Sequence, residues 1–221
     1  MSITPALAAA VPVHHHTLDV QGVRLFYREA GPANAPTVLL LHGFGASSYM
    51  FRNLIPVLAQ RYHVLAPDLP GFGQTEVAAG TRFDYTFDRL TSVIDAFTAA
   101  KGVDRYALYV FDYGAPVGWR LAVQHPDKIT AIVSQNGNAY EVGLSEGWAD
   151  ARTAWAHPTA ENREALRHFN TPEMIRWQYE EGVKDLWYPH VFSPTPSVGE
   201  RGLATYAGMP AIGRWAPWAS V

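Results

Sequence analysis

Asp112 is the residue whose type and position are best suited to chemistry in this sequence. Before it, residues 107–110 form a short apolar run with aromatic and β-branched side chains, which is typical of a buried strand. After it, residues 114–122 predict a helix with a small-residue face, and its first turn tolerates Pro116. A sharp turn from strand to helix presents the side chain at its apex, as in the nucleophile elbow usually written G-x-S-x-G. The sequence therefore predicts an elbow that carries a carboxylate instead of a serine hydroxyl.

A carboxylate at this apex favours one type of reaction. Serine must lose a proton before it attacks, whereas Asp, with a reference pKa of about 3.9, is ionised at neutral pH. Attack on an ester or amide would give a reactive anhydride. Attack on a saturated carbon bearing a halide, or on a strained epoxide carbon, gives a stable alkyl ester on the enzyme. The alternative is that Asp112 is an ordinary helix N-cap, because Asp is a favoured capping residue.

Apolar runs alternate with helical patterns through the first part of the chain. Strands are expected at residues 17–20, 23–29, 37–41, 63–66, 107–110 and 129–134. Helices are expected after a cap at Ser47 or Ser48, from Asp84 or Thr86 to Gly102, and after the elbow. The first of these has its apolar positions at Phe51, Leu54, Ile55 and Leu58. This alternation predicts an α/β fold with a mostly parallel sheet of about six strands.

The pattern becomes polar and helical after residue 136. Helices are expected at residues 144–155, 159–169 and 172–181, and the segment suits a helical cap that closes over an apolar site. From residue 186 onward, prolines and glycines break any period, which suggests an aberrant or disordered tail. The expected division is therefore a core at residues 1–136, a cap at 137–185 and an irregular tail at 186–221.

Three motifs together resemble the aspartate-nucleophile branch of the α/β-hydrolase fold superfamily. This branch contains epoxide hydrolases, haloalkane dehalogenases and fluoroacetate dehalogenase-like proteins. The motifs are His42-Gly43-Phe44, Asp68-Leu69-Pro70-Gly71-Phe72-Gly73 and Asp112-Tyr113-Gly114-Ala115. Their order and spacing also match, over roughly residues 15–185. The resemblance implies a hydrolase whose alkyl-ester intermediate is later hydrolysed by water.

The resemblance also implies roles for individual residues. Asp112 would be the nucleophile, and the backbone N–H groups of Phe44 and Tyr113 would form the oxyanion hole. Tyr179, or less favourably Tyr140, could protonate an epoxide oxygen from the cap. The substrate-binding candidates in the cap are Trp148 and Trp155. Packing between helices is the ordinary alternative for each of these cap aromatics.

Several positions depart from the pattern of the branch or have a structural explanation. Gly45 stands where the branch usually has Pro, which predicts a less rigid oxyanion loop. Val110 replaces the small residue that is common two places before the nucleophile. His42 is expected to shape the oxyanion loop rather than transfer protons, and Asp68 is expected to cap its own glycine-rich turn.

The mechanism of the branch also needs a base histidine and an orienting acid, normally supplied after the cap. Residues 186–221 contain no strand followed by Asp and no Gly-His element, and the loop at 135–138 has no carboxylate. We therefore expect a chain truncated at its C-terminus, with an apolar sheet edge left uncovered at residues 129–134. The alternative to an active enzyme is a catalytically incomplete or non-catalytic α/β-hydrolase-like protein.

Composition excludes several other classes of function. The absence of cysteine excludes disulfides, thiolate catalysis and cysteine metal sites. A net charge of −3 gives no reason to expect a nucleic-acid or anionic-membrane partner. No stretch approaches membrane-spanning length, and the N-terminal segment lacks the basic region of a signal peptide. His14-His15-His16 could bind a metal, but a fraying first strand is the preferred explanation.

These observations predict a cytoplasmic protein that needs no cofactor or metal. The expected partner is a small apolar organic substrate. The substrate's identity, its leaving group and the oligomeric state are left open by the sequence.

Overall fold

The computed structural model describes residues 11–167 and 171–180 of the 221-residue chain. The chain divides into two compact units. The first unit, Met1–Phe83 with Phe87–Ala139, contains the sheet, and the second, Asp84–Thr86 with Tyr140–Val221, contains the later helices. The irregular tail predicted at residues 186–221 lies outside the described residues.

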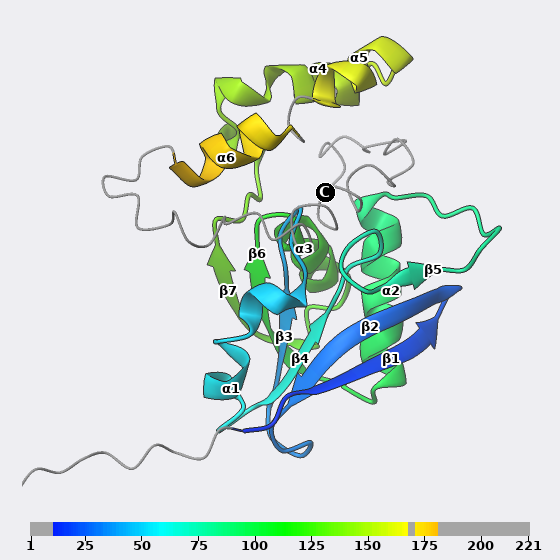
Figure 1. Cartoon of the computed structure of the whole chain (residues 1–221). Coiled ribbons are helices and arrows are strands. Elements are labelled where there is room, and N and C mark those ends of the chain that lie inside the picture. Colours follow the sequence, from blue (N-terminus) through cyan, green and yellow to red (C-terminus); the bar gives the residue numbers. More distant parts are fainter. Residues whose placement is uncertain (1–10, 168–170, 181–221) are drawn as a thin grey trace, which may run out of the picture. The chain divides into compact units, whose positions relative to one another are not determined.

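A seven-stranded sheet organises the first unit, with strand order β1-β2-β4-β3-β6-β7 and a short β5 paired to β2 (Figure 1). The strands are β1 His14–Val20, β2 Val23–Ala30, β3 Thr37–Leu41, β4 His63–Pro67, β5 Glu76–Val77, β6 Tyr106–Phe111 and β7 Ile129–Gln135. β3 pairs in parallel with β4 and β6, and β6 pairs in parallel with β7. β2 pairs antiparallel with β1, β4 and β5. The α/β fold is confirmed, and β5 is an additional strand that the sequence did not predict.

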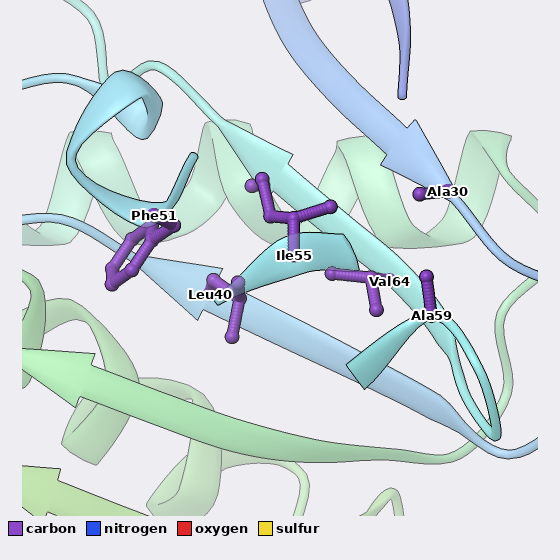
Figure 2. Close-up of a cluster of buried hydrophobic side chains, with 7 residues drawn as sticks. Ala30, Leu40, Phe51, Ile55, Ala59 and Val64 are labelled. Carbon is purple, nitrogen blue, oxygen red and sulfur yellow. The ribbon is translucent and has the colours of Figure 1, made fainter. Parts of the chain in front are cut away.

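The central strands are apolar because helical elements cover both faces of the sheet. α2, Phe87–Ala100, and α3, Gly114–Gln124, lie on one face, and the 3-10 helix η1, Ser48–Phe51, and α1, Ile55–Leu58, lie on the other (Figure 1). Figure 2 shows the core beneath η1 and α1, where buried side chains from strands and helices meet: Ala30, Leu40, Phe51, Ile55, Ala59 and Val64. Burying each large apolar side chain contributes about 1.5–3 kcal/mol. Because Leu40 belongs to β3 and Val64 to β4, this core fixes the two strands whose following loops form the candidate site.

The expectation of one helix after Ser47 or Ser48 is wrong, because the chain forms the two short helices η1 and α1 instead. Pro56 explains the break. Proline has no N–H and its ring clashes with the carbonyl four residues earlier, so it is accommodated only in the first turn of α1. Of the two predicted caps, Ser47 is the one that caps η1, because its hydroxyl accepts a hydrogen bond of 3.3 Å from the Tyr49 N–H.

β7 lies at the edge of the sheet, where its side chains are mostly exposed. Ile132 is 39% exposed and Val133 is 53% exposed. Within the described part of the chain, β7 pairs only with β6. The apolar sheet edge predicted at residues 129–134 is therefore observed in β7.

The second unit is helical, as predicted, but its helices are shorter than expected. Their bounds are η2 Glu141–Gly143, η3 Glu146–Trp148, α4 Ala149–Ala156, α5 Ala160–Ala165 and α6 Pro172–Glu180. α4 stops before His157 and Pro158 because a residue that precedes proline is disfavoured in helical conformation. Across the described residues, no helix has the length and apolar character needed to cross a membrane.

Candidate active site

The predicted corner between strand and helix is present at Asp112. β6 ends at Phe111, and α3 begins at Gly114 with Tyr113 as its N-cap residue. Asp112 has φ 47°, in the left-handed region, which Asp tolerates better than most non-glycine residues. Its side chain is exposed, whereas the next residues of the chain are buried. The corner therefore presents a single carboxylate outward from a buried strand and helix.

Close packing explains why small residues surround this corner. A Cβ at Gly114 would lie 2.4 Å from the carbonyl oxygen of Leu41, at the end of β3. A Cβ at Gly43 would lie 2.9 Å from the Cβ of Asp112. Both glycines are needed because β3, its following loop and the corner approach one another more closely than a side chain allows.

Val110 fits beneath the helix because Gly118 leaves room for it. A Cβ at Gly118 would lie 2.3 Å from Cγ1 of Val110, which is fully buried. The larger residue before the corner is thus matched by a smaller one in the first turns of α3. This compensation accounts for the departure noted in the sequence.

The Asp112 side chain is bound to the loop after β3. The Phe44 N–H donates a hydrogen bond of 2.7 Å to Oδ1 of Asp112. The carboxylate therefore does not cap its own helix, and the N-cap alternative is wrong for this structure. Phe44 lies where the resemblance placed an oxyanion donor, and Tyr113 begins the helix. The oxyanion roles of both N–H groups stay predictions.

Gly45 adopts a conformation that proline cannot. Its φ is 66°, whereas the proline ring fixes φ near −65°. The Ala46 N–H donates to the Gly43 carbonyl, at 3.3 Å, and closes the turn that contains Phe44 and Gly45. The glycine is therefore required by the turn that presents the Phe44 N–H.

Aromatic rings form an apolar wall beside the corner. The Tyr113 ring lies 4.6 Å from the Phe87 ring and 5.5 Å from each of the Phe44 and Phe72 rings, measured between centroids. Burial raises the pKa of the Tyr113 phenol above its usual range, and the adjacent Asp112 carboxylate raises it further. Tyr113 therefore stays neutral at any physiological pH and contributes apolar surface.

His42 has both ring nitrogens occupied. Its Nδ1–H donates to the Gly43 carbonyl at 2.8 Å, and its Nε2 accepts from the Leu69 N–H at 2.9 Å. The ring is fully buried, and this burial lowers the pKa of His42 although the Gly43 carbonyl and nearby carboxylates favour the charged form. His42 is therefore a neutral residue that orders the loop, as predicted, and it is not placed to act as a base.

Asp68 holds its own turn, as predicted. Its Oδ2 accepts a hydrogen bond of 2.8 Å from the Gln74 N–H, and its carbonyl accepts one of 2.6 Å from the Thr75 hydroxyl. Two further residues contact this carboxylate that the sequence analysis did not single out, Arg28 and Ser48. Both are polar residues that the fold buries, and burial depends on pairing between distant segments that the sequence does not reveal.

The cap candidates lie in the second unit. The Trp148 and Trp155 rings lie 6.0 Å apart, and Trp148 is 40% exposed. Tyr140 is largely exposed, and Tyr179 belongs to α6 but its side chain lies outside what the structure describes. Substrate binding by the tryptophans and proton donation by either tyrosine stay predictions.

The histidine run near the N-terminus belongs to β1. His14 and His16 have their ring centroids 6.1 Å apart on the exposed edge of the sheet. Among the described residues, no group of three or more His, Cys, Asp or Glu side chains is arranged to hold a metal ion. The strand interpretation of this run is confirmed.

Comparison with known proteins identifies the class of this chain. The family described as alpha/beta hydrolase fold matches residues 36–178, and the chain belongs to that family. An uncharacterized hydrolase of Saccharomyces cerevisiae is 46% identical over 173 residues, which cover 76% of this chain and 59% of that protein. A haloalkane dehalogenase of Mycobacterium marinum is 39% identical over 121 residues, covering 54% of this chain and 40% of the relative.

A solved structure gives a similar result. Epoxide hydrolase A from Mycobacterium thermoresistibile superposes with a TM-score of 0.52 and 34% identity, covering 56% of this chain and 39% of that one. The chain thus spans 40 to 59% of the length of the two curated relatives described above.

Proposed function

We propose that Asp112 is a nucleophile that attacks carbon in an epoxide or haloalkane-type substrate. The observation that carries this proposal is the exposed carboxylate with Oδ1 held by the Phe44 N–H. With Oδ1 held by this donor, the other oxygen, Oδ2, is the one available to attack carbon. The aromatic wall around Tyr113 suits a small apolar organic molecule.

The proposed first step forms a bond between Oδ2 of Asp112 and the substrate carbon. In a haloalkane the carbon–halogen bond breaks and the halide leaves with the bonding electrons. In an epoxide the ring carbon–oxygen bond breaks, and the resulting alkoxide takes up a proton from water. Both routes give an alkyl ester in which Oδ1 becomes the carbonyl oxygen.

The proposed second step is attack by water on the carbonyl carbon of this ester. Negative charge then develops on Oδ1, where the Phe44 N–H already lies at 2.7 Å. Loss of one such donor typically raises the barrier by about 3 kcal/mol. Collapse of the intermediate releases an alcohol or a diol and restores the carboxylate.

A second candidate function is attack without turnover. His42 has both ring nitrogens occupied, so it does not supply the base that activates water. The other histidines described in the first unit lie in β1, at the start of β4 and after α3, away from the loops at the corner. In this case the ester forms once and persists, and the chain is catalytically incomplete.

The test is exposure of the full chain to styrene oxide and to an alkyl bromide, followed by intact and peptide mass spectrometry. We expect a covalent mass increase located at Asp112, and none in Asp112→Asn, which keeps an Oδ1 acceptor and tolerates the same backbone. Equal labelling of both proteins would overturn the proposal.

Product release distinguishes repeated turnover from a single attack after which the ester stays trapped on Asp112. If the chain turns over, reaction in water enriched in oxygen-18 places the isotope in the Asp112 carboxylate, because water attacks the ester carbonyl. If it traps, the adduct is stoichiometric and no diol or halide accumulates beyond one equivalent. A folded protein with neither adduct nor isotope at Asp112 contradicts both candidates.

A further inference from the structure

Two loops at the same edge of the sheet are joined through one carboxylate. They are the oxyanion loop after β3, residues 42–48, and the Asp68 loop after β4, residues 68–75. Oδ1 of Asp68 accepts hydrogen bonds of 2.7 Å from the Ser48 N–H and 2.5 Å from the Ser48 hydroxyl. Oδ2 of the same carboxylate is used within its own turn. Asp68 therefore connects the two loops as well as capping one of them.

The oxyanion loop is held at both of its ends by consecutive residues. Asp68 binds Ser48 at one end, and the Leu69 N–H binds His42 Nε2 at the other, at 2.9 Å. Phe44, whose N–H meets Asp112, lies between these two attachments. The loop that carries this N–H is therefore also held by bonds made outside its own turn.

Arg28, on β2, contacts both Ser48 and Asp68. Its Nη1 donates to the Ser48 hydroxyl and lies 3.9 Å from Oδ1 of Asp68. All three residues are buried, with 6% exposure for Arg28, 1% for Asp68 and none for Ser48. Burial lowers the pKa of Arg28, and the Asp68 charge opposes that effect.

The burial of this group is expensive, which is informative about its role. Removing a carboxylate and a guanidinium from water costs free energy that their attraction does not reliably recover. A surface turn could be capped by a partly exposed Asp or Asn without that cost. Buried charged groups contribute more to fixing one geometry than to stability in some proteins. Here the geometry that they fix is the position of the oxyanion loop.

We propose that Asp68, acting through Ser48 and Arg28, is a positioning residue for the Phe44 N–H. Its catalytic consequence rests on the proposed function of Asp112, but its structural consequence does not. Asp68 does not touch the substrate or the reacting atoms. It holds the oxyanion loop so that the Phe44 N–H meets Oδ1 of Asp112 before substrate arrives.

The competing explanation is that Asp68 holds only its own turn. Two substitutions separate these explanations. Ser48→Ala removes the hydroxyl link between the loops and leaves the Gln74 and Thr75 bonds to Asp68 in place. Thr75→Val removes the bond from its hydroxyl to the Asp68 carbonyl and the bond that this hydroxyl accepts from the Phe26 N–H of β2, and it leaves both links to the oxyanion loop. Ser48→Cys is a second interloop variant, which keeps the shape of the side chain but replaces its oxygen with a larger sulfur that makes weaker hydrogen bonds.

The first measurement does not depend on catalysis. It follows the Phe44 amide in the 15N-labelled full chain by its proton chemical shift and its hydrogen-exchange rate. We expect Ser48→Ala to move the amide proton upfield and to speed its exchange roughly tenfold, with a smaller effect in Ser48→Cys. Thr75→Val should stay within about twofold of wild type. Equal responses to Ser48→Ala and Thr75→Val, or no response to either, would overturn the proposal.

The second measurement is the rate of ester formation and breakdown at Asp112. We expect Ser48→Ala to slow ester breakdown roughly tenfold relative to Thr75→Val, because negative charge develops on Oδ1 in that step and a displaced donor no longer meets it. Ester formation, in which Oδ1 loses charge, should change less. If the Phe44 amide responds as expected but no protein forms an ester, the function of Asp112 fails and the positioning role stands. If the ester forms and breaks down equally fast in both variants, the positioning role fails and the nucleophile stands.

Discussion

Asp68 and Asp112 are the same residue type at the same edge of one sheet, yet they occupy opposite environments. Asp68 follows β4, is 1% exposed, and accepts three hydrogen bonds on its carboxylate oxygens. Asp112 follows β6, is exposed, and within the described residues accepts one hydrogen bond, from Phe44. A carboxylate whose oxygens are all occupied can only organise its surroundings. One that is held at a single oxygen keeps the other for chemistry.

The largest expected effect is on chemistry at Asp112. Asp112→Asn should reduce covalent labelling by an epoxide or alkyl halide by at least about 1,000-fold, because the neutral amide is a poor nucleophile. Its free energy of unfolding should change by less than about 1 kcal/mol, because Asn tolerates a left-handed backbone and the site is exposed. Labelling rates and urea unfolding of the same protein check both parts. A variant that labels normally would place the reactive group elsewhere.

Substitution of Asp68, unlike that of Asp112, should strongly reduce the stability of the protein. Asp68→Ala is expected to lower the free energy of unfolding by about 3 kcal/mol, because it leaves the Arg28 charge buried without its carboxylate. Urea unfolding beside Asp112→Asn makes the comparison directly. If both variants lose similar stability, the distinction between the two carboxylates is wrong.

Substitutions at Gly45 test the oxyanion loop, which binds Asp112 through Phe44 and Asp68 through Ser48. Gly45→Pro should cost about 2 kcal/mol of stability and disrupt the Phe44 contact, because proline cannot adopt a positive φ. Gly45→Asn should cost less than about 1 kcal/mol, since Asn tolerates that conformation. Thermal unfolding and the Phe44 amide shift report the two effects. Tolerance of proline here would mean that the turn has another accessible conformation.

Glu29 extends the comparison to a carboxylate bound by a lysine and a histidine side chain. It accepts bonds of 2.7 Å from His63 Nε2–H and 2.9 Å from Lys101 Nζ. Burial alone would raise the pKa of Glu29, but the bonds from Lys101 and His63 outweigh it and hold the pKa below 4.5.

A lowered folded-state pKa adds stability above the unfolded-state pKa, and this stability is lost as the pH falls through the folded-state pKa. Glu29→Gln should therefore lower the free energy of unfolding by on the order of 1 kcal/mol at pH 7, and by less as the pH falls below about 4.5. Urea unfolding at pH 7 and pH 3.5 checks this. A loss that is the same at both pH values would show that the charge of Glu29 is unimportant.

Much of the core followed from local patterns in the sequence. Continuous apolar runs located β3, β4 and β6, and the flanking residues located the corner at Asp112. Pro56 is a signal for the broken helix, although the apolar spacing around it is typical of one continuous helix. The two-residue strand β5 has too little sequence for any period to appear.

The connection among Arg28, Ser48 and Asp68 could not be predicted in the same way. Its members come from a strand, a helix start and a loop that are distant in sequence. Arg28 lies in an alternating strand and resembles an ordinary exposed cation. Only the antiparallel pairing of β2 with β4, in which Arg28 lies opposite Ala66, brings its side chain beside the Asp68 loop. Register between distant strands is a tertiary property, and local propensity does not encode it.

The left-handed backbone at Asp112 also limits how this position can drift during evolution. Asp, Asn and Gly are the residues that accept such a φ at low cost, and Asn and Gly codons are each one nucleotide away from an Asp codon. The commonest single-base changes tolerated by the fold would therefore remove the carboxylate while leaving the sheet and the corner intact. Descendants of this chain can therefore keep the fold after they have lost the Asp112 carboxylate and the reaction proposed for it.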